Sequence, residues 1–127
     1  MLNCIALFYA LSFGFHIISM VYAYKNVSTS FTIPLLEFVT IEPHGYLFKA
    51  TPDYNTDVAE YFVPNVLNED IRFTYFEHNF RILAGQYTCE VYEYNTGEET
   101  PTDETGLNRI AIVRLNVEET ETNSIYI

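Results

Sequence analysis

"GQYTCEVYEY", residues Gly85 to Tyr94, is the stretch that decides the fold of this chain. Its side chains alternate between polar and apolar, which predicts a β-strand with Tyr87, Cys89 and Val91 on one face. A strand with one apolar face has to cover that face with a second layer of structure. The stretch therefore predicts a sheet whose inner face, including Cys89, belongs to a hydrophobic core.

The sequence around this stretch continues the β pattern after residue 30. Strands are expected at 31–43, as an edge strand kinked by Pro34 and Pro43, and at 44–52, 58–64, 70–80, 85–94 and 108–119. The segments 52–57 and 65–70 are expected to be turn-rich links. Short strands spaced about 8 to 12 residues apart predict an all-β antiparallel sandwich.

The segment between the last two expected strands, 95–108, contains two glycines, one proline and four carboxylates. It is longer than the usual hairpin loop of about 2 to 5 residues. A loop of this length is expected to be either functional or mobile.

The run Gly85-x-Tyr87-x-Cys89 resembles the run in the penultimate strand of immunoglobulin superfamily domains. The resemblance implies an immunoglobulin-like β-sandwich in which Tyr87 bonds back to the backbone and Cys89 points into the core. Residues 39–50 then resemble the entry into the family's second strand, and 109–117 resemble its last strand.

Three features depart from the family pattern. The second-strand cysteine is absent, and the resemblance puts Ala50 or Phe48 in its place. The chain contains no Trp, so Tyr61 or Phe62 is expected to fill the core position of the family's Trp. The acidic residue that usually precedes the run is missing as well, and the sequence is interpreted as a divergent member of the family.

The first 23 residues contain no Asp, Glu, Lys or Arg and end in the small-x-small triplet Val21-Tyr22-Ala23. This pattern predicts a hydrophobic signal helix at 1–23 that is cleaved after Ala23, a secreted domain at 24–118 and an acidic tail at 119–127. Because the apolar run approaches the about 20 residues of a membrane-spanning helix, an uncleaved anchor that displays the domain stays open. A fragment of a larger cell-surface receptor is a further alternative.

The charge is strongly acidic, with 17 Asp and Glu against 6 Lys and Arg and a net charge of -11. Nucleic acids and anionic membrane surfaces require clustered cations, so the sequence argues against both as partners. An extracellular protein is the expected partner class. Asn26 begins the sequon Asn26-Val27-Ser28 and is a candidate glycosylation site in an exported chain.

Cys89 is the one cysteine left once Cys4 is removed with the signal segment, so no disulfide within the domain is expected. Three interpretations stay open for it. It is a buried free thiol, or half of an intermolecular disulfide in a linked dimer, or, least favoured, a nucleophile, which would need an activating base.

No catalytic, cofactor or metal motif stands out. His44 and His78 lack the spacing of zinc ligands, and the acidic loop lacks the calcium-loop pattern. We therefore expect no enzyme, although a closed pocket lined by His44 or His78 would favour an enzyme or a ligand carrier. The expected activity is protein binding through the acidic loop and an adjoining strand face with exposed aromatic residues. Its candidate residues are Tyr92, Tyr94, Glu98, Glu99, Asp103 and Glu104, and Tyr54 and Phe76 are expected to be exposed too.

Overall fold

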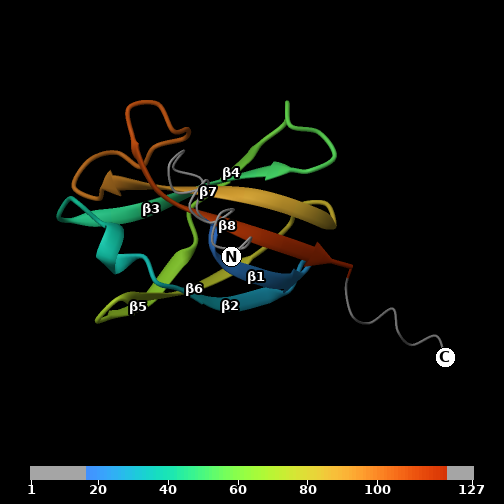
Figure 1. The fold of residues 1–127 in the computed structure, drawn as a ribbon, viewed down its shortest axis with the longest axis horizontal. Coiled ribbons are helices and arrows are strands. Elements are labelled where there is room, and N and C mark those ends of the chain that lie inside the picture. Colours follow the sequence, from blue (N-terminus) through green and yellow to red (C-terminus); the bar gives the residue numbers. More distant parts are fainter. Residues whose placement is uncertain (1–16, 120–127) are drawn as a thin grey trace, which may run out of the picture.

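The computed structural model describes residues 17–119 and shows an all-β sandwich of two sheets (Figure 1). In chain order the elements are β1 (Ile17–Tyr24), β2 (Ser28–Ile33), the 3₁₀ helix η1 (Leu36–Phe38), β3 (His44–Pro52), β4 (Glu60–Phe62), β5 (Asn65–Asp70), β6 (Phe73–Asn79), β7 (Gly85–Asn95) and β8 (Asn108–Glu118). The expected all-β sandwich is confirmed.

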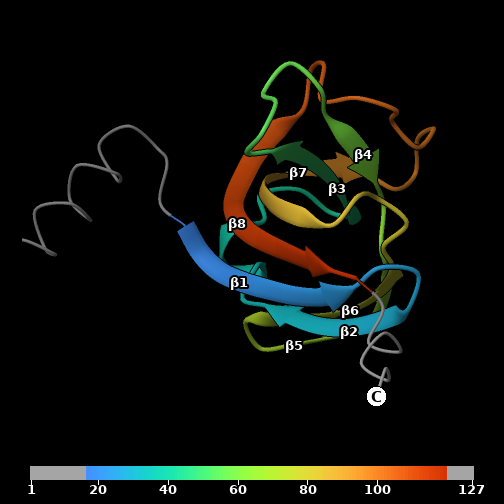
Figure 2. The same cartoon turned by 90° about the vertical axis from the view of Figure 1, so that its right-hand side faces the viewer.

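One sheet has five strands in the order β1-β8-β7-β3-β4, and the other has three in the order β2-β6-β5. Figure 2 shows β1 and β2, which belong to different sheets, lying next to each other. Every ladder is antiparallel except that between β1 and β8, which is parallel.

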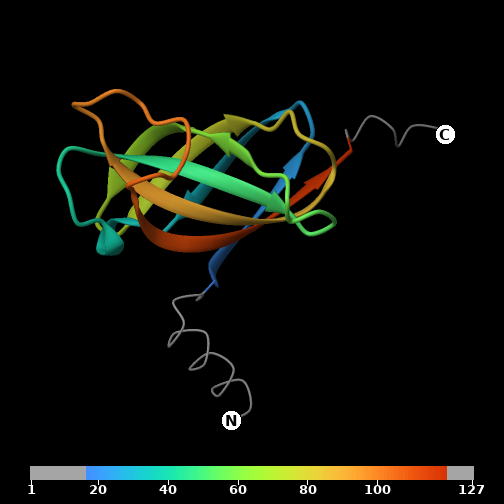
Figure 3. The same ribbon diagram turned by 90° about the horizontal axis from the view of Figure 1, so that it is seen from above.

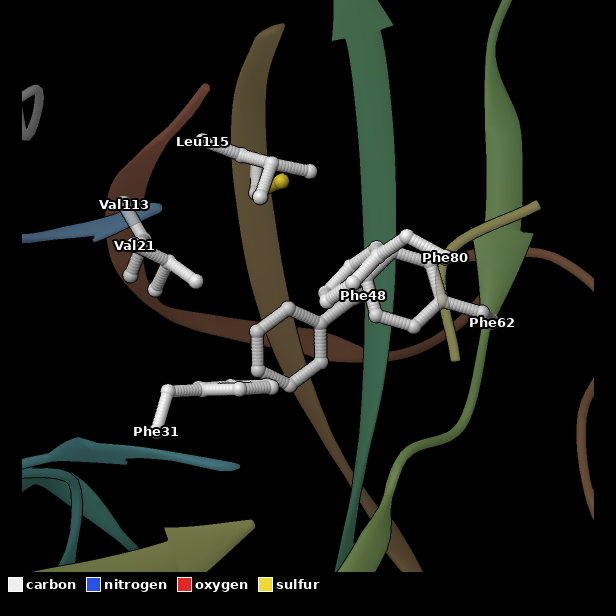
Figure 4. A pocket seen from close by; sticks show the side chains of 8 residues that line it. Val21, Phe31, Phe48, Phe62, Phe80, Val113 and Leu115 are labelled. Atoms are coloured by element: carbon white, nitrogen blue, oxygen red, sulfur yellow. The ribbon is translucent and has the colours of Figure 1, made fainter. Parts of the chain in front are cut away.

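The core lies between the sheets and is built by the alternation that the sequence shows. β3 contributes Tyr46, Phe48 and Ala50, β7 contributes Tyr87, Cys89 and Val91, and β8 contributes Ala111, Val113, Leu115 and Val117. From the opposite sheet, Phe31 stacks on Phe76 with ring centroids 5.1 Å apart and meets Phe48 edge to face at 6.3 Å. Figure 4 shows the aromatic residues gathered on one side of the core, where they line a void of about 10 Å³.

The tyrosine that the resemblance singled out makes the expected bond. The Tyr87 hydroxyl donates to the backbone carbonyl oxygen of Leu83 at 2.6 Å and closes the corner between β6 and β7. Cys89 is 1% exposed and faces the core. Gly85, which begins β7, has a φ of 150°, a conformation that side chains rarely adopt.

Several strand predictions need correction. The segment 39–50 does not enter the second strand, because β3 begins only at His44 and pairs with β7 in the same sheet. Ala50 is the register partner of Cys89 there, so neither Ala50 nor Phe48 can stand across the sandwich from it. The second strand is β2, and the expected edge strand at 31–43 ends at Ile33, before η1.

The core position expected for Tyr61 or Phe62 is filled differently. Tyr61 is 36% exposed, and Phe62 is half-buried and stacks on the fully buried Phe48 at 5.2 Å. Phe48 of β3 is thus the central aromatic residue of this part of the core. The expected link at 65–70 is also a strand, β5, which pairs with β6.

The sandwich begins at Ile17, upstream of the expected start at Tyr24. Residues Ile17–Tyr24 pair with β8 from Ile112 to Glu118, and Val21 and Ala23 are 4% and 5% exposed. The part of the expected signal helix at 17–23 is therefore strand, whereas 1–16 lie outside the described residues. Most of the expected acidic tail, 120–127, lies outside them too. Within 17–119 no helix has the length and apolarity needed to cross a bilayer.

Candidate protein-binding end

Three connections meet at one end of the sandwich: 34–43 between β2 and β3, 71–72 between β5 and β6, and 96–107 between β7 and β8. The registers put them there, because Ile33 pairs with Thr74, His44 with Asn95, and Asp70 with Phe73. Figures 1 and 3 show the connections from β2 to β3 and from β7 to β8 projecting from the same side. We call this surface the loop end.

The long connection from β7 to β8 is fastened to the five-stranded sheet by Glu104. The Glu104 carboxylate accepts a hydrogen bond from Lys49 Nζ at 3.0 Å and a short one from the Tyr61 hydroxyl. These bonds hold the pKa of Glu104 at about 2. Glu104 therefore anchors the loop to β3 and β4, in place of the exposed role expected for it.

A small hydrophobic cluster lies beneath the same loop. Leu107 packs on Tyr92, Tyr94 and Leu47, which form a second core on the outer face of the sheet. Tyr92 and Tyr94 are 8% and 9% exposed, so the expectation that they are surface residues is wrong. They support the loop from below, and Tyr92 pairs with Leu47 of β3 on the outer face of the sheet.

Glu93 joins two of the three connections. It is 2% exposed, and its carboxylate accepts hydrogen bonds from the Thr40 backbone at 2.8 Å, the Thr40 hydroxyl and Asn108 Nδ2 at 2.8 Å. Burial acts to raise the pKa of Glu93, but these bonds outweigh it and lower the pKa. A buried charge held by several donors is costly to disturb, so Glu93 fixes the spacing between the two loops.

A hollow of about 320 Å³ opens between these two loops. Thr40 and Ile41 line one side, Glu98 and Leu107 line the other, and Glu93 is among the lining residues. The loop end is thus concave at this point and carries a carboxylate within the concavity.

A second polar network connects the two sheets below the loop end. The Glu69 carboxylate of β5 accepts hydrogen bonds from the Tyr46 hydroxyl and, at 2.8 Å, from Thr74 Oγ1. It also lies 2.9 Å from His44 Nε2. His44 Nδ1 in turn lies 2.9 Å from Glu42. Burial acts to raise the pKa of Glu69, yet its three partners lower it overall. His44 therefore has a structural place between β3 and β5.

Three exposed apolar residues that sequence reasoning missed lie at the loop end. Phe38 follows β2, Ile41 precedes β3, and Ile71 occupies the turn from β5 to β6, with exposures of 38%, 37% and 88%. Ile71 also has a φ of 56°, a conformation unfavourable for a β-branched residue. No pattern in the sequence pointed to it, because Ile71 alternates with Arg72 in step with Phe73 and Thr74, as a strand residue would.

Acidic residues surround these apolar side chains. Seven carboxylates and one cationic residue, Arg72, lie in the segments 34–43, 70–73 and 95–108, which hold the three connections. Arg72 Nη2 lies 3.6 Å from Glu37 Oε2, and Arg72 Cζ lies 5.6 Å from the centroid of the Phe73 ring. Among the described residues, Glu98 and Glu99 are exposed, and Asp103, also exposed, accepts a bond from the Thr105 backbone at 3.0 Å. The loop end is therefore strongly negative.

The remaining predicted residues lie elsewhere. Asn26 is exposed in the turn from β1 to β2, where a glycan has room, and the Ser28 hydroxyl donates to Glu77. Tyr54 is 63% exposed, as expected, but at the opposite end of the sandwich, and Phe76 is fully buried, contrary to expectation.

Cys89 is buried in the core between the two sheets. Burial raises the pKa of its thiol to about 12, so it stays protonated near neutral pH. A thiol in this setting has neither the access nor the thiolate fraction for exchange or nucleophilic attack. The burial favours the interpretation as a packed free thiol over that as an intermolecular disulfide.

His78 lines an open surface groove of about 380 Å³ beside β4. Its ring stacks on Phe62 at 4.4 Å, and burial lowers its pKa. Asn79 Oδ1 in the same groove is buried, with no hydrogen-bond partner in the part of the chain described. Within residues 17–119 no three His, Cys, Asp or Glu side chains cluster as metal ligands would.

No protein-family model matches the chain, and no curated protein sequence matches it either.

Proposed function

We propose that this chain is an exported immunoglobulin-like domain that binds another extracellular protein through its loop end. Two features support the immunoglobulin-like assignment. The strand order β2-β6-β5 corresponds to strands B, E and D of the family, and β8-β7-β3-β4 corresponds to G, F, C and C′. The hydrogen bond from Tyr87 to Leu83 is also of the kind that the family's tyrosine corner makes.

The observation that carries the binding proposal is the composition of the loop end. Phe38, Ile41 and Ile71 are exposed apolar side chains within a strongly negative rim. Apolar anchors inside a polar rim are typical of protein interfaces. In variable-type immunoglobulin domains the corresponding B–C and F–G loops bind partners.

The support beneath the loops favours a preformed surface. Glu104 fastens the β7–β8 connection to β3 and β4, and Glu93 joins the β2–β3 connection to Asn108 at the start of β8. Loops held in this way lose less conformational entropy on binding. The negative charge selects a partner with a cationic surface and accelerates its approach at low ionic strength.

The test is a binding screen of the secreted domain against a panel of purified extracellular domains by surface plasmon resonance. The variant Glu98→Lys/Glu99→Lys should slow association with a captured protein at least tenfold and leave the melting temperature unchanged, because neither carboxylate supports the fold. A matched control is Glu118→Lys/Glu119→Lys, far from the loop end, which should bind as the wild type does. Equal loss in both variants, or none in the first, would remove the loop end from the interface.

A further inference from the structure

We propose that the mature protein retains β1, so that export does not cleave the chain after Ala23. The inference rests on the proposed export and concerns where the leader ends. The strand Ile17–Tyr24 and a signal segment that extends to Ala23 use the same residues, so both cannot exist in one mature molecule.

The strand is an integral part of the five-stranded sheet. It runs beside β8 over the whole stretch from Ile112 to Glu118, and the Lys25 backbone N–H continues the pairing to the Glu118 carbonyl at 2.7 Å. A cut after Ala23 would leave only Tyr24 of the eight residues of β1. The eleven-residue strand β8 would then become an open edge of the sheet.

The strand also closes the core. Val21 and Ala23 belong to the same buried cluster as Val113 and Leu115. Val21, Val113 and Leu115 line one void, and Figure 4 shows Val21 beside Val113. Removing β1 would open this part of the core to water, and burial of apolar surface is the main source of stability in a small domain without a disulfide.

The outward face of β1 explains why its sequence looks like a leader. Met20, Tyr22 and Tyr24 point to solvent and are 50%, 65% and 39% exposed. Apolar residues on both faces remove the alternation that identifies a strand, and the segment merges with the apolar run before it. A membrane-spanning helix through residues 17–23 would equally require β1 to leave the sheet.

The experiment is expression of the complete chain with a C-terminal tag in secreting eukaryotic cells, followed by deglycosylation and N-terminal determination by intact-mass and peptide mass spectrometry. A start at Ile17 or at any residue before it supports retention of β1. A start at Tyr24, or anywhere after Ile17, overturns it. Absence of the chain from the medium overturns this inference together with the proposed export, whereas a start at Tyr24 leaves the binding function intact.

Two neighbouring substitutions test the role of β1 independently of the cut. In the complete chain, Val21→Asp places a carboxylate in the core and should reduce the secreted yield at least fivefold. Tyr22→Asp changes the adjacent, outward-facing residue and should leave the yield within twofold of the wild type. Equal yields from both variants would show that β1 is not part of the mature fold.

Discussion

The hydroxyl of Tyr87 and the carbonyl oxygen of Leu83 are joined by a hydrogen bond of 2.6 Å, which closes the turn from β6 into β7. The Tyr87 ring is 2% exposed, and Leu83 is 59% exposed, so the bond links the core to the surface of the turn. Burial raises the pKa of Tyr87, and the hydroxyl remains a donor throughout the neutral range.

Replacing Tyr87 by Phe removes this bond and keeps the packed ring. We expect a loss of about 1 kcal/mol in the free energy of unfolding, measured by urea denaturation. Tyr54→Phe is the control, because the exposed Tyr54 hydroxyl makes no hydrogen bond within residues 17–119, and it should have no effect. Equal stability of Tyr87→Phe and the wild type would mean that water replaces the bond without loss.

Gly45 should not tolerate a side chain. A Cβ at this position would lie 2.6 Å from Cζ of Tyr94 and 2.9 Å from Cγ2 of Thr96. Overpacking of this kind costs about 1 to 3 kcal/mol, so Gly45→Ala should lower the melting temperature. In a Tyr94→Ala background the same change should cost clearly less, and an undiminished cost would contradict the proposed clash.

Glu104 should make the stability depend on acid pH. Hydrogen bonds from Tyr61 and Lys49 hold its pKa at about 2, below the ordinary value of 4.5. Because the pKa is lower in the folded state, this stabilisation is present above about pH 4.5 and is lost as the pH falls toward 2. Glu104→Gln should flatten the fall in melting temperature over that window. Glu98→Gln, at an exposed residue, should give a curve parallel to that of the wild type.

Ile71 should be unfavourable for stability. Its φ of 56° in the turn between β5 and β6 is a conformation that glycine adopts without strain. Ile71→Gly should therefore raise the free energy of unfolding by about 1 kcal/mol. The same change at the exposed Val66 of β5, which pairs with Phe76, should lower it, because glycine weakens a strand.

The strain at Ile71 also bears on the proposed function. If the loop end binds a partner, Ile71→Gly should weaken binding while it stabilises the domain, since it removes the most exposed apolar side chain there. A stabilised variant that binds as the wild type does would exclude Ile71 from the interface.

Cys89 should be unreactive in the folded protein. With its thiol pKa raised to about 12 by burial, a Cys4→Ser chain should react with a thiol reagent only after unfolding. The same chain should run as a monomer on a non-reducing gel. Rapid labelling in native buffer, or a reducible dimer, would show that the core opens at Cys89.

Alternation in the sequence predicted the strands whose two faces differ. The inner faces of β3, β7 and β8 were predicted correctly because every second side chain of these strands lies in the core, although part of their outer face is buried as well. β5 was missed, because it is an edge strand whose residues are almost all exposed and whose Asn and Asp residues favour turns. Pairing with β6 overrides that local preference.

The candidate site was predicted only in part. The acidic 95–108 connection could be recognised from its length and charge, but Tyr92 and Tyr94 lie beneath it and Glu104 fastens it. Phe38 and Ile41 come from the β2–β3 connection and Ile71 from the β5–β6 connection, and only the registers of the strands bring these connections to one end.

The sequence by itself determined the all-β class, the inward face of Cys89 and the acidity of the longest loop, because these depend on composition and on the two-residue period of a strand. The tertiary structure alone decided that Ile17–Tyr24 is a strand of the sheet. Its partner β8 lies about ninety residues away in the chain, and no local pattern can specify a pairing over that separation.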